Sequence, residues 1–188
     1  MSDALRVLTA FFAVVNPASV ALVAGAIRFP DERTRRAAIA IATVFAGGLA
    51  ALAAVAADAI LDGLEIEPET FRIAAGAVMA TAGVYAALRP GALTPAGQGS
   101  RADGLFPLGI PTLLSPAMLV AAMSYGADEG VGTAIGAALV VFVLAAATAI
   151  ALPAGRAPKL AADGIARLTG ALLVVLSVAL IVDGVLAV

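Results

Sequence analysis

Six apolar runs, each long enough to cross a lipid bilayer, constrain this chain more than any other feature of its sequence. A helix needs about 20 largely apolar residues to span the hydrocarbon core. The runs are Ala4–Ile27, Ala37–Leu61, Phe71–Leu88, Leu105–Tyr125, Val131–Leu152 and Ile165–Val188. Hydrophobic residues make up 62% of the chain, well above the roughly 45–50% of soluble domains. The sequence predicts an all-α integral membrane protein with six transmembrane helices, forming a single membrane domain over residues 1–188.

Charge and composition exclude several classes of function. The net charge is only −2, so no nucleic-acid partner is expected. The chain has no cysteine and no histidine, and we therefore expect no metal site and no cofactor. No run holds paired carboxylates, and the single lysine, Lys159, is predicted to lie in a loop, which excludes a serine–lysine dyad. We expect a protein that is not an enzyme.

The connections between the runs carry most of the charge, and its sign alternates along the chain. The first, third and fifth connections hold eight basic residues: Arg28, Arg33, Arg35, Arg36, Arg89, Arg101, Arg156 and Lys159. The connection between the second and third runs is acidic. Because cytoplasmic connections accumulate lysine and arginine, both termini are predicted to be periplasmic or extracellular. The expected location is the bacterial inner membrane, crossed several times.

Small residues recur within the runs, often four positions apart. The patterns are Gly47-Gly48, Gly76 with Ala80, and Gly132 with Gly136. Lipid gives little hydrophobic drive for helix association, so membrane helices pack by close backbone approach. We expect these glycines to lie at helix contacts. Such stripes also permit a homo-oligomer.

The beginnings of the two halves of the chain resemble each other. Residues 12–25 align without a gap on residues 111–124, which places Asn16-Pro17-Ala18 on Ser115-Pro116-Ala117. The segment Ile73–Val78 likewise resembles Leu168–Leu173. These matches indicate an internal repeat.

The repeat implies a particular topology. Its halves would cover about residues 1–90 and 104–188, joined by a cytoplasmic loop at 89–103. Each half holds three runs, and an odd number makes the second half enter the membrane from the opposite side. We therefore predict a 3+3 inverted-topology repeat, an arrangement found in many secondary transporters.

Prolines fall near the centres of the first and fourth runs, at Pro17 and Pro116. Proline removes a backbone N–H and displaces the carbonyl four residues back. The residues before them, Asn16 and Ser115, are of types preferred as helix N-caps, and proline is favoured at the first helical position. Each pair predicts a new helix that starts inside the membrane, making helices one and four discontinuous. In the alternative interpretation the prolines only kink continuous helices.

Two helix N-termini deep in the membrane would suit an anionic group. Each carries about half a positive charge together with unpaired N–H groups. We predict a substrate site there, formed by Asn16, Pro17, Ala18, Ser19, Thr112, Ser115, Pro116 and Ala117. Asp58 and Asp183 are candidates for ion coupling because they are the only acids within the runs, although solvated positions at helix ends are the simpler explanation.

Several segments carry a family resemblance. They are Phe11–Pro17, Phe71–Gly76, Pro107–Pro116, Ala166–Gly170 and Val182–Gly184. They resemble the MarC/SnatA family of bacterial inner-membrane proteins, whose name refers to small neutral amino acid transport. The resemblance implies six spans and, for some members, transport of glycine, alanine and similar amino acids. Two segments differ from the family pattern: Ser115-Pro116-Ala117 replaces a Gly-Pro-Gly-like turn, and Ala18-Ser19-Val20 replaces a Gly-Asn pair with bulkier neighbours.

Together these features predict a secondary transporter that exports or exchanges small neutral amino acids or similar metabolites. Asn16 and Ser115 would hydrogen-bond the substrate, and the two helix N-termini would hold its carboxylate. Two alternatives stay open, an ion or small-solute channel and a membrane scaffold or regulator that transports nothing. The expected partners are the lipid bilayer, the small substrate and, in a homo-oligomer, further copies of the chain.

Overall fold

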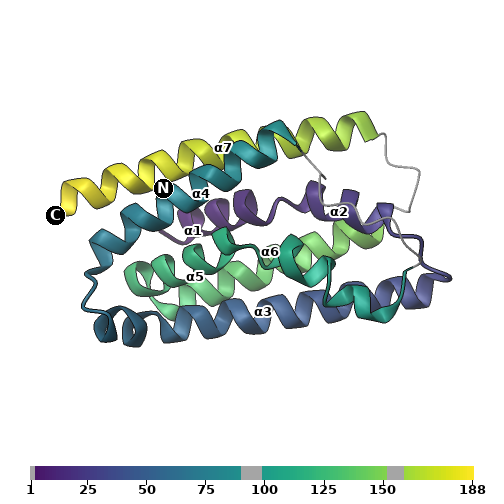
Figure 1. The fold of residues 1–188 in the computed structure, drawn as a ribbon, viewed down its shortest axis with the longest axis horizontal. Helices are drawn as coiled ribbons and strands as arrows, with labels where there is room; N and C mark the ends of the chain where they lie inside the picture. Colours follow the sequence, from purple (N-terminus) through teal and green to yellow (C-terminus); the bar gives the residue numbers. More distant parts are fainter. Residues whose placement is uncertain (1–2, 90–98, 152–158) are drawn as a thin grey trace.

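A computed structural model describes residues 3–89, 99–151 and 159–188, and the regular elements in these ranges are helices (Figure 1). They are α1 (Asp3–Val15), α2 (Pro17–Ala26), α3 (Glu32–Gly63), α4 (Pro68–Leu88), the 3-10 turn η1 (Arg101–Gly104), the π-helical turn η2 (Leu108–Leu113), α5 (Pro116–Glu129), α6 (Val131–Ala151) and α7 (Lys159–Ala187). The predicted helical architecture is confirmed. Leu152, Arg156 and most of the predicted loop 89–103 lie outside the described residues.

Five helical stretches are long and apolar enough to cross a bilayer: Asp3–Ala26, Glu32–Gly63, Pro68–Leu88, Val131–Ala151 and Ala161–Ala187. A sixth crossing results when η1 and η2 are joined to α5, although the two parts are bent by 62°. Both termini lie in the same half of the bundle, as an even number of crossings requires (Figure 1). The described chain therefore has five candidate spans, or six when the bent pair counts as one.

Large apolar side chains cover the outside of the bundle. The most exposed large apolar side chains on α3, α6 and α7 include those of Val44, Leu52, Val55, Val143, Leu168, Val175 and Leu186. An apolar surface of this extent would promote aggregation in water, whereas lipid chains cover it without penalty. The pattern is that of an integral membrane protein.

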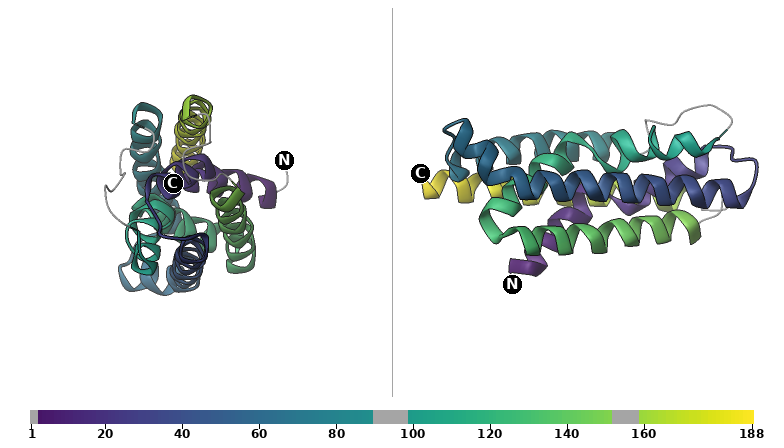
Figure 2. Two further views of the ribbon diagram at one scale, coloured as in Figure 1. Left: turned by 90° about the vertical axis from the view of Figure 1, so that its right-hand side faces the viewer. Right: turned by 90° about the horizontal axis from the view of Figure 1, so that it is seen from below.

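The helices α1 and α2 occupy the centre of the bundle. The most apolar 18-residue window of Asp3–Ala26 is 61% buried, whereas that of α4 is 22% buried. The two helices pack against α5, α6 and α7, and Figure 2 shows them passing between the other helices, with the start of α1 projecting from the bundle. The junction of α1 and α2 itself is buried, with Asn16 only 4% exposed.

A close contact joins α4 and α7, which lie side by side over most of their length (Figure 1). A Cβ atom on Gly170 would lie 2.6 Å from the backbone nitrogen of Ala87 and 2.9 Å from the carbonyl oxygen of Gly83. A Cβ atom on Gly76 would lie 3.0 Å from the carbonyl oxygen of Ser177. The predicted packing role of Gly76 is confirmed.

The packing prediction is wrong for three other glycines within this chain. A Cβ atom on Gly48, Gly132 or Gly136 would meet nothing within 4 Å. Gly47 has only ordinary contacts, with Leu139 and Phe142. Spacing places glycines on one face of a helix, but it does not tell whether that face meets another helix or lipid.

Two helices begin earlier than the apolar runs predict. The helix α3 starts at Glu32 because Asp31 caps it, accepting a hydrogen bond from the N–H of Thr34 at 2.7 Å. Hydrogen bonds from the N–H and hydroxyl of Thr34 hold the pKa of Asp31 below its usual value. The helix α7 starts at Lys159, so this residue is not in a loop as predicted. In α3 the residues added before the apolar run are mostly charged, and in α7 they include Lys159 and Asp163.

The fourth run does not form one regular helix. Between Leu105 and Ser115 the backbone forms bonds over five residues, including Ile110 N–H to Leu105 carbonyl at 2.9 Å and Leu114 N–H to Gly109 carbonyl at 2.8 Å. Pro107, Pro111 and Pro116 cannot donate backbone hydrogen bonds, which explains this wider pattern. The regular α-helix begins only at Pro116.

Candidate functional site

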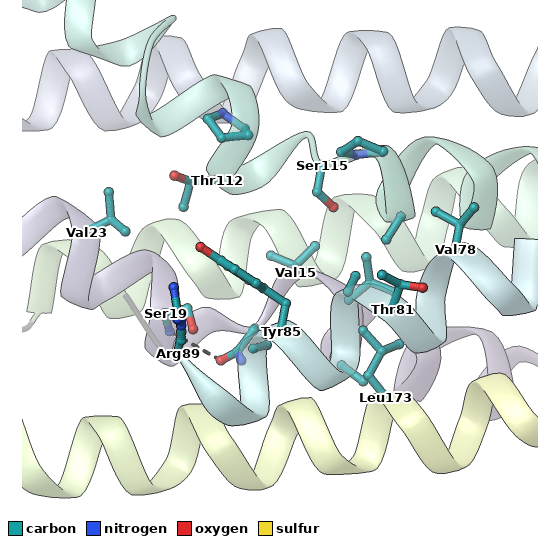
Figure 3. A pocket seen from close by; sticks show the side chains of 18 residues that line it. Val15, Ser19, Val23, Val78, Thr81, Tyr85, Arg89, Thr112, Ser115 and Leu173 are labelled. Atoms are coloured by element: carbon teal, nitrogen blue, oxygen red, sulfur yellow. Dashed lines mark hydrogen bonds between the residues drawn. The ribbon is translucent and has the colours of Figure 1, made fainter. Parts of the chain in front are cut away.

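A cavity of about 500 Å³ lies where α1 gives way to α2 and where η2 gives way to α5 (Figure 3). The second half of α4 forms another wall, and Leu173 of α7 adds to it. Most of the lining is apolar. The polar lining residues are Asn16, Ser19, Thr81, Tyr85, Arg89, Thr112 and Ser115.

Asn16 separates α1 from α2. Its backbone has φ 50° and ψ 76°, in the left-handed region that asparagine tolerates better than most residues. Its side-chain oxygen accepts the N–H of Ser19 at 3.2 Å and so caps α2. Its side-chain nitrogen donates to the carbonyl of Ala166 in α7 at 2.9 Å. The residue is 4% exposed and ties the start of α2 to α7.

Ser115 has the corresponding place before α5. Its backbone is extended, and its hydroxyl oxygen accepts the N–H of Met118 at 3.1 Å. Pro116 is then the first residue of α5, as Pro17 is of α2. Both motifs thus have the N-cap role that their sequences predict.

The caps leave some hydrogen-bonding capacity free for a ligand. One N–H of the Asn16 amide and the O–H of Ser115 are not used by the caps. The N–H of Ala117, the second residue of α5, has no acceptor within its own helix. These donors lie on residues that line the cavity. They can bind a carboxylate or carbonyl oxygen.

The structure brings six of the eight predicted substrate residues to this cavity: Asn16, Ser19, Thr112, Ser115, Pro116 and Ala117. Pro17 and Ala18 do not line it. The carbonyl of Pro17 instead lies 3.5 Å from the hydroxyl of Thr148 in α6, which donates to the carbonyl of Ala145 at 2.8 Å. The hydroxyl of Thr112 donates to the carbonyl of Pro107 at 2.8 Å, which leaves its lone pairs open to a donor.

Three polar lining residues on α4 and at its C-cap were missed by the sequence analysis. Thr81, Tyr85 and Arg89 are spaced four residues apart, and this spacing places them on one face of the helix. Thr81 and Tyr85 are the polar residues of the last turns of α4, and Arg89 is its C-cap. Their shared face was therefore visible in the sequence, whereas the cavity that it meets was not.

A family comparison now agrees with these observations. The model of the MarC family integral membrane proteins matches residues 1–188, the whole chain. The chain belongs to the MarC family. No curated protein and no solved structure matches it. Membership in this family and the apolar helices together establish a multi-pass integral membrane protein.

The two acids predicted for ion coupling do not reach the cavity of this MarC-family protein. Asp58 is exposed on α3. Asp183 accepts a hydrogen bond from Arg6 at 3.2 Å, and the same arginine also contacts the carboxylate of Glu129. Within the described ranges, no cluster of three or more acidic, histidine or cysteine residues could hold a metal ion.

A packed layer separates the cavity from these ion pairs. The rings of Phe11 and Tyr125 meet edge to face, with their centroids 5.7 Å apart. Both residues are at most 3% exposed. Phe11 lies about one helical turn before Val15, which lines the cavity, and about one turn after Arg6. From the N-terminus of α1 onward, the ion pairs of Arg6 therefore come first, the Phe11–Tyr125 contact second and the cavity third.

The two caps make a prediction about stability. Replacing Asn16 by alanine is expected to lower the free energy of unfolding by about 2–3 kcal/mol, because a cap worth about 1 kcal/mol is lost and alanine is strained in the left-handed region by roughly 1–2 kcal/mol. Asn16→Gly loses the cap without the strain and should cost about 1 kcal/mol less than alanine. SDS titration of the purified protein in mixed micelles measures both.

Ser115→Ala is the matched control, because Ser115 has an ordinary extended backbone. It should cost only the cap, about 1 kcal/mol. Equal losses for Asn16→Ala and Asn16→Gly would contradict the left-handed conformation of this residue.

Proposed function

We propose that this MarC-family protein is a secondary transporter of the bacterial inner membrane, which carries small neutral amino acids or similar metabolites through the cavity. The observation that carries this proposal is the meeting of two capped helix N-termini, those of α2 and α5, at one cavity inside an apolar bundle. Such ends hold anionic groups without a buried side-chain charge.

The arrangement of the two motifs supports an inverted repeat. The matched caps Asn16 and Ser115 both line the cavity, and α2 and α5 run away from it in opposite directions (Figure 1). In addition, α4, the third span of the first half, packs along α7, the third span of the second half. Both features are expected when two three-helix units face each other across a pseudo-two-fold axis.

The walls of the cavity suit a small amino acid. Alanines at 13, 82, 86 and 117 leave room for a short side chain. The N–H of Ala117 and the hydroxyl of Ser115 would hydrogen-bond the substrate, and the positive ends of α2 and α5 would attract its carboxylate. Pro17 has no N–H for the carbonyl of Ala13, so this oxygen is free to accept from the substrate ammonium. A small zwitterion therefore finds donors and acceptors in the same space.

The unequal packing on the two sides of the cavity favours a carrier over an open channel. On one side the Phe11–Tyr125 contact and the Arg6 ion pairs fill the bundle. On the other side the lining continues along α4 to Arg89 at its end. A pathway closed on one side of its binding site is what alternating access requires. By the distribution of basic residues, the closed side would be periplasmic.

The test is counterflow in proteoliposomes, in which vesicles preloaded with unlabelled alanine take up labelled alanine. Ala82 lines the cavity, so Ala82→Leu is expected to abolish counterflow by filling the site. Ala77 is exposed on the same helix and does not line the cavity, so Ala77→Leu should keep most of the activity. The two variants add the same side chain to the same helix.

Each result separates the candidate functions. Saturable exchange that Ala82→Leu removes and Ala77→Leu retains would support the carrier. A linear flux that does not exchange would instead favour a channel. No flux of alanine or of related small metabolites, from protein shown to be folded, would leave the scaffold or regulator as the better account.

A further inference from the structure

Among the described residues that line the cavity, one carries a formal charge. Arg89 is the residue at which α4 ends, and it lines the cavity together with Ser19 and Tyr85. Figure 3 shows these three side chains at the same end of the cavity. Tyr85 precedes Arg89 by one helical turn, so the two side chains share the face of α4 that looks into the hollow.

No described lining residue carries a negative charge that could balance this arginine. The ion pairs among the described residues involve Arg6, Arg35, Arg36 and Arg72 instead. The N-termini of α2 and α5 add positive potential to the same space. The mostly apolar walls strengthen any electrostatic interaction inside the cavity. Arg89 and Tyr85 are exposed at this end of the cavity, and the positive potential there favours an occupant that brings an anionic group.

We infer that Arg89 determines the charge of the ligand, so that the cavity selects small carboxylates and rejects analogues in which the carboxylate is replaced by an uncharged group. This inference rests on the proposed binding cavity and adds the residue that distinguishes among ligands. A guanidinium pairs with a carboxylate through two parallel N–H donors, a geometry that an amide cannot match. The hydroxyls of Ser19 and Tyr85 can complete the shell of donors.

Direct binding tests this inference without relying on transport. Equilibrium dialysis of the purified protein in phosphatidylcholine nanodiscs would use labelled propionate, a carboxylate without an ammonium group. Unlabelled alanine should displace it, whereas alaninamide, which has no carboxylate, should not. Arg89→Gln is expected to weaken binding by roughly tenfold or more, because a charge-assisted pair is lost. Arg89→Lys keeps the positive charge but not the paired N–H donors of the guanidinium. Its affinity for propionate should lie between those of the unmodified protein and Arg89→Gln.

Arg33→Gln is the matched control for charge. Arg33 lies in the first turn of α3, is exposed and does not line the cavity. Arg33 belongs to another connection predicted to be cytoplasmic, and Arg33→Gln changes the net charge by the same amount as Arg89→Gln. Propionate binding should be unchanged in this variant.

Three results would overturn the inference: no propionate binding by the folded protein, equal binding by the Arg89→Gln and Arg33→Gln variants, or displacement by alaninamide as strong as by alanine. Nanodiscs that contain phosphatidylglycerol provide one further arm. Loss of propionate binding in them would mean that Arg89 pairs with a lipid headgroup and would also overturn the inference. A protein that binds propionate through Arg89 but shows no counterflow would refute only the transport proposal.

Discussion

Arg72→Met is expected to lower the free energy of unfolding by about 3 kcal/mol or more, since removal of one partner strands a buried charge. Two nitrogens of Arg72, Nε and Nη2, donate to the carboxylate of Asp128 at 2.8 and 2.6 Å. The side chain of Asp128 is only 7% exposed, and that of Arg72 is 19% exposed. Without Arg72, the carboxylate keeps one long contact among the described side chains, to Ser124 at 3.4 Å. SDS titration in mixed micelles measures the loss.

The double variant Arg72→Met with Asp128→Leu distinguishes two contributions to the free energy of unfolding: the penalty of leaving one charge unpaired and the stabilisation by the ion pair itself. A buried pair replaced by apolar residues is often neutral, so the double variant should recover most of the loss. The exposed pair of Arg36 and Glu32 is the control. Its side chains are 64% and 49% exposed, and Arg36→Met should change stability by less than about 1 kcal/mol. Similar losses for the single variants Arg72→Met and Arg36→Met would show that Asp128 is hydrated.

The length of the apolar runs made the spans predictable. A run of about 20 apolar residues has few stable alternatives to a membrane helix, because lipid offers no partner for exposed backbone groups. The N-caps were equally accessible, since Asn16-Pro17 and Ser115-Pro116 are local signals that need no knowledge of the fold. The polar residues at the cavity that belong to these motifs could therefore be named from the sequence.

The face that each helix turns to its neighbours was not predictable in the same way. A soluble helix shows its buried side by a polar face opposite an apolar one, whereas a membrane helix is apolar all round. Gly76 and Gly132 occur in similar sequence patterns. A Cβ atom added to Gly76 would meet the backbone of α7, whereas one added to Gly132 would meet nothing within 4 Å. The sequence likewise showed Arg89 only as a basic residue at a helix end, because it does not tell that this face of α4 meets a cavity. The Arg72–Asp128 pair joins residues 56 positions apart, which no local pattern reveals.

The contact between α4 and α7 gives the second large effect expected on stability. Gly170→Ala should lower the free energy of unfolding by about 1–3 kcal/mol, the usual cost of overpacking. The added methyl would lie 2.6 Å from the backbone nitrogen of Ala87 and 2.9 Å from the carbonyl oxygen of Gly83. Backbone atoms cannot rotate away as a side chain can, so the two helices must separate. The loss can be measured by SDS titration.

Gly132→Ala is the matched substitution on α6, where a methyl would meet nothing within 4 Å. It should leave stability unchanged or raise it slightly, because alanine loses less entropy in a helix than glycine does. The same chemical change is thus expected to have opposite signs at the two positions. If Gly170→Ala proved as harmless as Gly132→Ala, the close approach of α4 and α7 would be refuted. If Gly132→Ala were the damaging one, this face of α6 would have to meet another molecule, and a second copy of the chain would be the first partner to test by crosslinking.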